Sequence, residues 1–266
     1  NYRELRAELE ALGYRFFSDG DTEVVLKAFH AWGRDCVRRF HGMFAFAIAE
    51  RDSGTLTLAR DRFGIKPLYL APVPGGLRFG SSLPALLAGG GLDTSVAPVA
   101  LHHYLSWHAV VPPPHTILAG VRKLAPATVS SWTADGRRQA TRYWDLRVKT
   151  DPELAALPVA ERERLVDDAL RVAVRRRMVA DVPVGVLLSG GVDSSLIVAL
   201  LAEAGQHDLR TFSIGFEAAG GEAGDEFAFS DLVAGRFGTR HTQIRIPTSD
   251  LLAALPGTVA AMSEPM

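Results

Sequence analysis

The chain has 266 residues, of which 47% are hydrophobic and 22% are charged, as in ordinary globular proteins. A formal net charge of −1 gives no electrostatic reason to bind nucleic acid or an anionic membrane, and no apolar run reaches the length of a bilayer span. One cysteine, Cys36, excludes an internal disulfide and a cysteine-based zinc site, and with no secretory signal visible we expect a cytoplasmic protein.

The first half of the chain begins with two amphipathic segments. Residues 2–13 and residues 22–32 repeat apolar side chains at helical spacing, and the first segment stops at a glycine. We therefore predict two helices that each bury one face. The side chains expected to face the core are Leu5, Leu9, Leu12, Val25, Leu26 and Phe29.

Four short β-rich runs follow these helices, at residues 42–51, 55–63, 67–72 and 77–81. The turns between them contain Gly or Pro, as hairpin connections do. Helices followed by a set of antiparallel strands predict an α+β layered domain. The sequence YWDL, which ends at Leu146, closes this domain.

Two side-chain clusters suggest a metal or nucleic-acid site at first sight. His102, His103 and His108 lie near Trp107, but they lack a metal-ligand spacing, so we expect them on a helix or loop surface. An arginine-rich run stands alone in a nearly neutral chain, so we expect a solvated helix face, or one packed against the first domain. The run consists of Arg171, Arg175, Arg176 and Arg177.

The second half alternates strand and helix patterns. Its first strand is a continuous β-branched run, typical of a strand covered on both faces. Strands separated by helices predict a doubly wound parallel sheet, an α/β fold. The expected elements are a helix at 161–178, a strand at 184–188, a helix at 194–205, a strand at 211–216, a helix at 226–237 and a strand at 241–246.

The loop after the first of these strands reads SGGVDSS and suits an anion. Gly190 and Gly191 let a ligand approach the main chain, and the free N–H groups at the helix start favour phosphate. Three hydroxyls, of Ser189, Ser194 and Ser195, add donors. Asp193 would repel a bare phosphate, so its presence predicts a Mg²⁺ between the two. The structural alternative is a glycine-rich strand–helix turn with a serine cap.

Two parts of the chain resemble known families. S-G-G-x-D-S after a buried strand is similar to the pyrophosphate-binding loop of the ATP pyrophosphatases. NYRELRAELEALGYRF, GDTEVVLKAFHAWG and GMFAFAIAERDSGTLTLARDRFGIKPLYL resemble the glutaminase domain of glutamine-hydrolysing asparagine synthetases, which precedes such a loop. The resemblance implies an α+β N-terminal-nucleophile (αββα) glutaminase domain at 1–146, a linker at 147–160 and an α/β doubly wound ATP-pyrophosphatase domain at 161–266. Both ends of the chain look cut, so we expect both domains to be incomplete.

The resemblance also assigns site residues in the second domain. ATP and Mg²⁺ are the implied cofactors, with Asp193 helping to hold the metal, and further metal ligands are expected beyond residue 266. The implied ATP-binding residues are Leu188, Ser189, Gly190, Gly191, Asp193, Ser194 and Ile214.

In the first domain the resemblance assigns one residue. The family's N-terminal cysteine nucleophile matches nothing here, so no catalytic residue is named, and Cys36 is expected to be a structural thiol. Asp21 matches the aspartate that holds the amino group of glutamine, although the family has serine where this chain has Gly20. A helix N-cap is the other interpretation of Asp21. The charged side chains Arg60, Asp61, Arg62 and Lys66 are expected to be structural.

The implied reaction is a glutamine-dependent amidation. Glutamine supplies ammonia, ATP activates a carboxylate as an acyl-adenylate, and ammonia converts it to an amide. Aspartate is the default acceptor, whereas YLSWHAVVPPPHTIL, GFEAAGGEAGDEFAFSDLVAGRF and MSEPM resemble enzymes that amidate N-acetylglutaminylglutamine. The alternatives are an amide- or lactam-forming cyclase on an inactive glutaminase scaffold and a non-catalytic interaction protein. The expected partners are small molecules, and a homodimer stays open.

Overall fold

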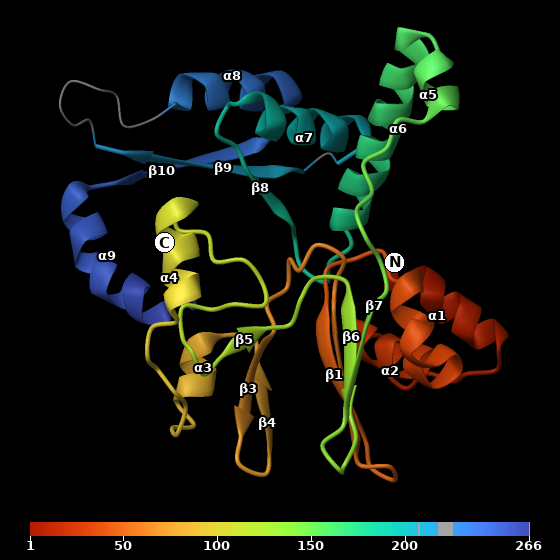
Figure 1. Cartoon of the computed structure of the whole chain (residues 1–266). Coiled ribbons are helices and arrows are strands. Elements are labelled where there is room, and N and C mark those ends of the chain that lie inside the picture. Colours follow the sequence, from red (N-terminus) through yellow and green to blue (C-terminus); the bar gives the residue numbers. More distant parts are fainter. Residues whose placement is uncertain (207, 218–225, 266) are drawn as a thin grey trace. The chain divides into compact units, whose positions relative to one another are not determined.

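The computed structural model describes residues 1–206, 208–217 and 226–265, and the described chain falls into two compact units (Figure 1). Unit 1 contains Asn1–Arg147 together with residues 258–265, and unit 2 contains Val148–Gly257. The glycine-rich loop expected after residue 216 lies largely outside the described residues. Because residues 258–265 belong to unit 1, the chain leaves this unit once and then returns to it.

Two helices and a short 3₁₀ helix form the outer layer of unit 1: α1 (Tyr2–Ala11), α2 (Asp21–Trp32) and η1 (Gly33–Arg39). Leu5 and Leu9 of α1 are buried as predicted. The prediction is wrong for Leu12, which follows the end of α1 and is 61% exposed, and for Leu26, which is 54% exposed. The buried apolar residues of α2 are Val24 and Ala28, which lie one turn apart. Leu26, halfway between them in sequence, therefore points away from the core.

Unit 1 contains two antiparallel sheets rather than one continuous set of strands. The first has the order β1-β2-β6-β7 and the second the order β4-β3-β5. The predicted hairpins β1–β2 and β3–β4 are both present. The strands are β1 (Ala45–Glu50), β2 (Thr55–Arg60), β3 (Tyr69–Val73), β4 (Gly76–Gly80), β5 (Arg122–Lys123), β6 (Thr128–Trp132) and β7 (Arg138–Arg142), and the helices α3 (Leu83–Leu87) and α4 (Pro98–Ser106) lie between β4 and β5 in the chain.

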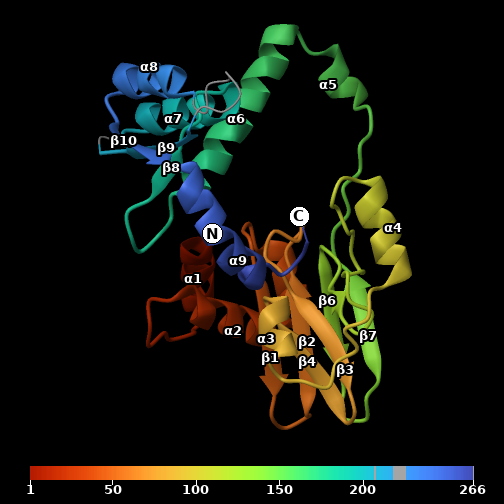
Figure 2. The ribbon, with the colours of Figure 1, turned by 90° about the vertical axis from the view of Figure 1, so that its left-hand side faces the viewer.

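Side chains that alternate along the strands pack the two sheets against each other and against the helices on either side. On β2, Ala59 packs with the core beneath α1 and α2, while its neighbour Leu58 packs with Leu70 of β3. On β3, Tyr69 and Ala71 point the other way, into a core shared with α3. Successive strand residues face opposite sides, so unit 1 has the layers helix, sheet, sheet, helix. This is the predicted αββα architecture, which Figure 2 shows from a second side.

The turn after β2 is held by two buried charged side chains. Asp61 accepts hydrogen bonds from the backbone N–H groups of Phe63 (3.1 Å), Ile65 (3.0 Å) and Lys66 (2.9 Å). Arg60 donates to the carbonyls of Lys66 (2.8 Å), Gly64 (2.6 Å) and Leu124 (2.6 Å). Burial lowers the pKa of Arg60, against the charge of Asp61. Both side chains are engaged with the main chain, in agreement with the structural role predicted for them.

Unit 2 is a parallel three-stranded sheet with helices, as predicted. The sheet has the order β10-β9-β8, with β8 and β10 each parallel to β9. The stretch predicted as a linker contains a short helix, α5. The elements are α5 (Pro152–Ala156), α6 (Val159–Arg177), β8 (Gly185–Leu187), α7 (Val192–Glu203), β9 (Arg210–Phe216), α8 (Phe227–Phe237), β10 (Arg240–Ile246) and α9 (Thr248–Ala261), which begins in unit 2.

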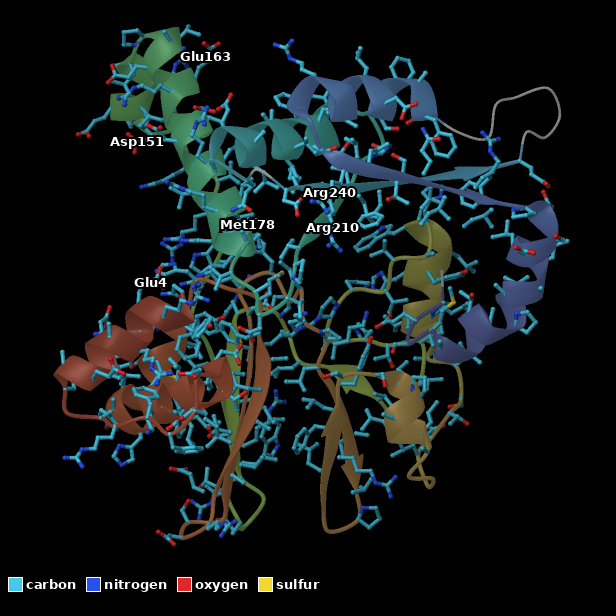
Figure 3. The ribbon with its side chains drawn as sticks, turned by 180° about the vertical axis from the view of Figure 1, so that it is seen from behind. Glu4, Asp151, Glu163, Met178, Arg210 and Arg240 are labelled. Carbon is cyan, nitrogen blue, oxygen red and sulfur yellow. The ribbon has the colours of Figure 1, made fainter. Side chains whose placement is uncertain are left out.

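The two faces of this sheet differ, so the prediction that its first strand is covered on both faces is wrong for the described residues. Leu188, just after β8, packs into a core with Val198 and Leu201 of α7 and Ala234 of α8. The other face carries exposed apolar side chains, including Leu187, Ile214, Phe216 and Ile244. At the amino ends of the strands, Arg210 and Arg240 pair in register (Figure 3). The carboxyl ends of the strands lie at the opposite end of the sheet, where the chain leaves β8 and reaches Ser189.

The arginine-rich run of α6 has ordinary helix-surface contacts. Arg171 pairs with Asp167 on its own helix and with Glu203 of α7, each at 2.6 Å. These hydrogen bonds raise its pKa. Residues 175–177 are exposed, in agreement with a solvated face. No helix in the described parts of the chain is long and apolar enough to cross a membrane.

Candidate nucleotide-binding loop and glutamine-site residues

The loop between β8 and α7 brings the predicted hydroxyl groups together. Ser189 Oγ lies 3.1 Å from Ser194 Oγ and accepts a hydrogen bond from the Gly191 N–H at 3.3 Å. Ser194 Oγ also donates to the Gly191 carbonyl at 3.2 Å. The loop therefore closes over the start of α7, at the carboxyl edge of a parallel sheet where α/β folds bind ligands.

Gly190 and Gly191 are glycines for different reasons. Gly190 has φ of +86°, and a Cβ there would lie 2.5 Å from Phe229 Cβ and 2.7 Å from the Ser230 nitrogen. The fold itself therefore requires glycine at 190. Gly191 has φ of −69° and ψ of 165°, and an added Cβ would meet only Ser189 Oγ at 3.4 Å, an ordinary contact. The described fold leaves glycine at 191 unexplained, which fits a position that a ligand approaches closely.

Two further groups fit an anion and its metal. Ser195 Oγ is buried and has no hydrogen-bond partner among the described residues. Asp193 is exposed in the first turn of α7, where helix N–H groups point outward and no side chain caps them. No group of three or more ligand side chains occurs among the described residues, but Mg²⁺ commonly uses one or two carboxylates together with phosphate oxygens. The donor set thus fits a magnesium–phosphate group.

The predicted pair Leu188 and Ile214 lies on opposite faces of the sheet. The Leu188 side chain is buried in the core under α7, and its N–H donates to the Phe212 carbonyl at 2.8 Å. Ser213 Oγ donates to the Leu188 carbonyl. Ile214 is 48% exposed on the open face. The predicted contact with adenine therefore reduces to the Ile214 side chain and to the Leu188 main chain.

Asp21 is the first residue of α2, and the N-cap interpretation is wrong. The N-cap is Gly20, and no side chain caps this helix end. Asp21 is exposed, and its carboxylate accepts a long hydrogen bond from Thr22 Oγ1 at 3.5 Å. The carboxylate is therefore free of the strong backbone bond that a capping aspartate would accept.

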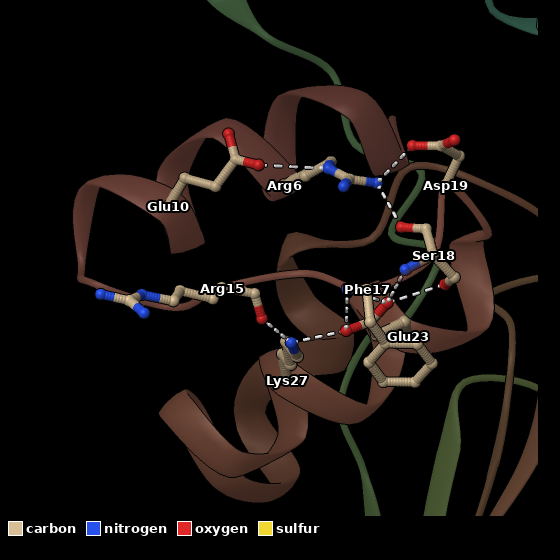
Figure 4. Close-up of polar contacts among 8 residues, drawn as sticks. All are labelled: Arg6, Glu10, Arg15, Phe17, Ser18, Asp19, Glu23 and Lys27. Carbon is tan, nitrogen blue, oxygen red and sulfur yellow. Dashed lines mark hydrogen bonds and ion pairs between the residues drawn. The ribbon is translucent and has the colours of Figure 1, made fainter.

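Sequence reasoning missed Glu23, the strongest acceptor near Asp21. Its carboxylate is buried and receives hydrogen bonds from Phe17, Ser18 and Lys27 (Figure 4). Burial alone would raise the pKa of Glu23, but the hydrogen bonds from Lys27, Ser18 and Phe17 outweigh it and lower the pKa to about 2. In the sequence Glu23 is only a glutamate in the first turn of a predicted helix, five residues after Ser18, which is not a known capping signal.

Cys36 lies in the core beneath α1 and α2 and is fully buried. Burial raises the pKa of its thiol to about 12. A cleft of about 1200 Å³ opens nearby, between α2 and the first sheet, and its lining includes Phe29, Thr57 and Ser131. Asp21 does not line it, so the cleft and the predicted glutamine-binding residue are separate features. His102 and His103 lie on α4, as predicted for a helix surface, and the His103 ring is tilted against the Trp107 ring with their centroids 4.9 Å apart.

Comparison with known families matches both units. Residues 1–144 match the model of a glutamine amidotransferase domain, and residues 165–266 match that of asparagine synthase. The chain belongs to the asparagine synthetase family of glutamine amidotransferases. Its fold is therefore an N-terminal-nucleophile amidotransferase domain followed by part of a parallel α/β synthase domain, and an asparagine synthase domain implies the use of ATP.

Individual relatives support this membership. The chain is 39% identical over 224 residues to asparagine synthetase [glutamine-hydrolyzing] 1 of Bacillus subtilis, covering 83% of this chain and 34% of that protein. Asparagine synthetase [glutamine-hydrolyzing] 3 of the same organism is 32% identical over 276 residues, covering 100% and 44%. Amidase chyE of Penicillium rubens is 30% identical over 193 residues, covering 71% and 28%. The chain thus spans less than half the length of these relatives.

Proposed function

We propose that the protein is a glutamine-dependent carbon–nitrogen ligase of the asparagine synthetase type. Glutamine and water give glutamate and ammonia. A carboxylate oxygen of the acceptor attacks the α-phosphorus of ATP, and pyrophosphate leaves. Ammonia then attacks the acyl carbon. The bond between this carbon and the former carboxylate oxygen breaks, and AMP leaves with that oxygen. The observation that carries this proposal is the loop 189–195, which has two features the fold does not account for, at Gly191 and at Ser195 Oγ.

The loop residues have separate roles in this proposal. The N–H groups at the start of α7 and the hydroxyls of Ser189, Ser194 and Ser195 donate to pyrophosphate as its charge grows. Gly191 leaves room for the phosphate to approach the main chain. Asp193 would hold Mg²⁺, which offsets phosphate charge when bound. Ile214 offers an apolar surface to adenine from the open face of the sheet.

In unit 1 we assign Asp21 to the substrate ammonium of glutamine. Its carboxylate is exposed and lacks the capping bond that would make it structural. Aspartate is the acceptor that the related synthetases suggest, and N-acetylglutaminylglutamine is the alternative acceptor. Of the three stretches that favour the dipeptide, the second includes residues 218–225, which lie outside the described residues.

The proposal is tested with the full-length protein by measuring pyrophosphate release from ATP with aspartate and, separately, with N-acetylglutaminylglutamine. Asp193→Asn keeps the shape of the loop and removes one charge, so acceptor-dependent release should fall by about 100-fold or more. Glutamine hydrolysis should continue, because it belongs to the other unit. Asp208→Asn, which changes an exposed aspartate at the amino edge of the sheet, is the matched control and should leave release unchanged.

Three outcomes would contradict parts of this proposal. Near wild-type release in a folded Asp193→Asn variant would leave the aspartate as part of a strand–helix turn only. ATP-dependent product formation without any glutamine hydrolysis would favour the cyclase. Absence of pyrophosphate release with every acceptor would favour a non-catalytic interaction protein.

A further inference from the structure

The segment before α2 is fixed by side chains rather than by regular secondary structure. Residues 15–19 lie in the connection between α1 and α2, and the hydrogen bonds and ion pairs described for them come from three side chains on those helices (Figure 4). Arg6 belongs to α1, and Glu23 and Lys27 belong to α2. A connection of this length on a protein surface is ordinarily held by its own turn bonds and by water. Here it is held from both flanking helices.

Glu23 makes the central contacts. Its Oε2 accepts from the Ser18 N–H at 2.8 Å and from Ser18 Oγ at 2.7 Å. The Phe17 N–H lies 3.2 Å from both carboxylate oxygens. Lys27 Nζ pairs with Oε1 at 2.5 Å and also donates to the Arg15 carbonyl. The buried Glu23 carboxylate therefore binds two consecutive backbone N–H groups. It also binds Lys27, which in turn holds the Arg15 carbonyl.

Arg6 closes the segment from the other side. Its Nη1 donates to the Ser18 carbonyl at 2.8 Å and lies 3.5 Å from an Asp19 carboxylate oxygen. Its Nε pairs with Glu10 at 3.2 Å. The guanidinium also lies 4.5 Å from the ring centroid of Phe16, and Lys27 Nζ lies 4.4 Å from the same centroid. Ser18 is thus held at its backbone N–H, its backbone carbonyl and its side-chain hydroxyl.

Burying these charged side chains costs desolvation free energy, so the arrangement is better explained by the position that it gives to residues 15–19 than by stability. Burying a carboxylate and a lysine together gains little stability over an apolar packing of the same volume. It does, however, fix a short piece of chain in one geometry. That piece leads directly into Gly20 and Asp21, where α2 begins, and Glu23 lies one half-turn further on. The contacts of Glu23 therefore help to hold the backbone at the start of α2, from which the Asp21 side chain projects.

We propose that Glu23 is a positioning residue of the glutamine site, which fixes residues 15–19 and the start of α2 so that Asp21 meets the substrate ammonium. The proposal rests on the function assigned to Asp21 above. Glu23 does not touch the substrate in this scheme and acts through Asp21. A backbone already held in place does not have to be ordered when the Asp21 carboxylate binds the ammonium, so the effect falls on the KM for glutamine.

The test uses the full-length protein and compares glutamine-dependent with ammonia-dependent product formation. Glu23→Gln replaces an acceptor of N–H groups by an amide that must present a donor to some of them. We expect the KM for glutamine to rise about 10-fold or more, with the ammonia-dependent rate within about twofold of wild type. Asp21→Asn should raise the same KM, and the double variant should be less than additive, because both changes act on one contact.

Glu8→Gln is the matched control. Glu8 also lies on α1 and forms an ion pair, with Arg39 of η1, but this pair involves none of the three side chains that hold residues 15–19. It should leave the KM for glutamine unchanged. Ser18→Ala, which removes only the hydroxyl bond, should raise the KM by a smaller factor, and it decides the question if Glu23→Gln does not fold.

The possible failures are distinguishable. If Asp21→Asn raises the KM for glutamine but Glu23→Gln and Ser18→Ala do not, the positioning role is wrong and the assignment of Asp21 stands. Full additivity in the double variant, or an equal fall in glutamine- and ammonia-dependent rates, also overturns the positioning role, because either result describes a purely structural contact. An unchanged KM in Asp21→Asn overturns the assignment of Asp21 and the inference with it.

Discussion

Adjacent glycines in the loop after β8 answer to different constraints. At Gly190 a side chain would strike the main chain of α8 and would need φ of +86°, whereas at Gly191 a methyl group meets only one ordinary contact. The fold therefore requires glycine at 190, whereas the described fold does not explain glycine at 191. The sequence motif alone, S-G-G, makes the two look equivalent.

This difference gives a paired prediction. Gly190→Ala should lower Tm by roughly 5 °C or more, because the backbone strain and the clash with Phe229 and Ser230 both act on the folded state. Gly191→Ala should melt within a degree or two of the wild type and still lose acceptor-dependent pyrophosphate release. Melting curves and release assays on both variants check this. A stable, fully active Gly191→Ala would show that no ligand approaches there.

The thiol of Cys36 should be inert in the native protein. With a pKa of about 12, roughly one thiol in ten thousand is ionised at pH 8, and the sulfur is fully buried. We expect labelling by a disulfide reagent at neutral pH to be slow and to follow the rate of unfolding. Fast labelling of folded protein, at a rate independent of denaturant, would contradict the structural role.

At the scale of single residues, the sequence identified the hydroxyls and acid of the loop because their spacing carries chemistry. It could not identify Glu23 as an anchor. Known helix-start signals place a glutamate three residues after a serine, whereas here Ser18 precedes Glu23 by five. The contact depends on how α1 and α2 face each other, which a local pattern does not contain.

At the scale of elements, segments with a clear apolar pattern were predicted, and strands rich in polar residues were missed. The helices α1, α2, α6, α7 and α8 and the strands β1 to β4 and β8 to β10 were predicted, because each has a clear apolar pattern. The hairpin β6–β7 was missed, although Asp135-Gly136 in its turn is a strong hairpin signal. Its strands, TVSSW and RQATR, carry serine, threonine and arginine where an apolar alternation was sought. The split into two sheets depends on long-range packing.

The turn between β2 and β3 should be a point of high sensitivity. Asp61 is 1% exposed and accepts from four backbone N–H groups, those of Phe44, Phe63, Ile65 and Lys66. Asp61→Ala leaves these donors buried without an acceptor, which should lower the free energy of unfolding by about 3 kcal/mol or more. Urea unfolding of this variant measures the loss. Asp52→Ala, an exposed position in the neighbouring hairpin turn, should cost less than about 0.5 kcal/mol.

At the scale of the whole molecule, unit 1 is completed by a distant piece of chain. Glu264 accepts from Tyr69 Oη at 3.0 Å and pairs with Lys123 Nζ at 2.7 Å, and Ser263 Oγ accepts from the Leu83 N–H at 3.2 Å. Lys123 also donates to the Val111 carbonyl at 2.6 Å. A boundary drawn after Leu146, as the sequence suggests, leaves these contacts out of the first domain.

Two buried tyrosines should make unit 1 sensitive to alkali. Burial raises the pKa of Tyr69, with Glu264 adding to the shift, and burial raises the pKa of Tyr143. The folded state holds both phenolic protons above the usual tyrosine pKa of about 10, where the unfolded state releases them, so stability is full below pH 10 and falls as pH rises beyond it. Ultraviolet absorbance should show both ionising together with the loss of circular dichroism. Ionisation of Tyr69 in protein that keeps its circular dichroism would contradict the buried position.

The return of the chain to unit 1 also sets an order of events during synthesis. Tyr69 and Lys123 leave the ribosome long before Glu264, with the whole of unit 2 in between. At ordinary translation speeds the interval from Arg147 to Glu264 lasts about 6 to 23 s. For that time the amino-terminal unit lacks the partly buried ion pair between Lys123 and Glu264, which can form only after residues 189–195 have been made.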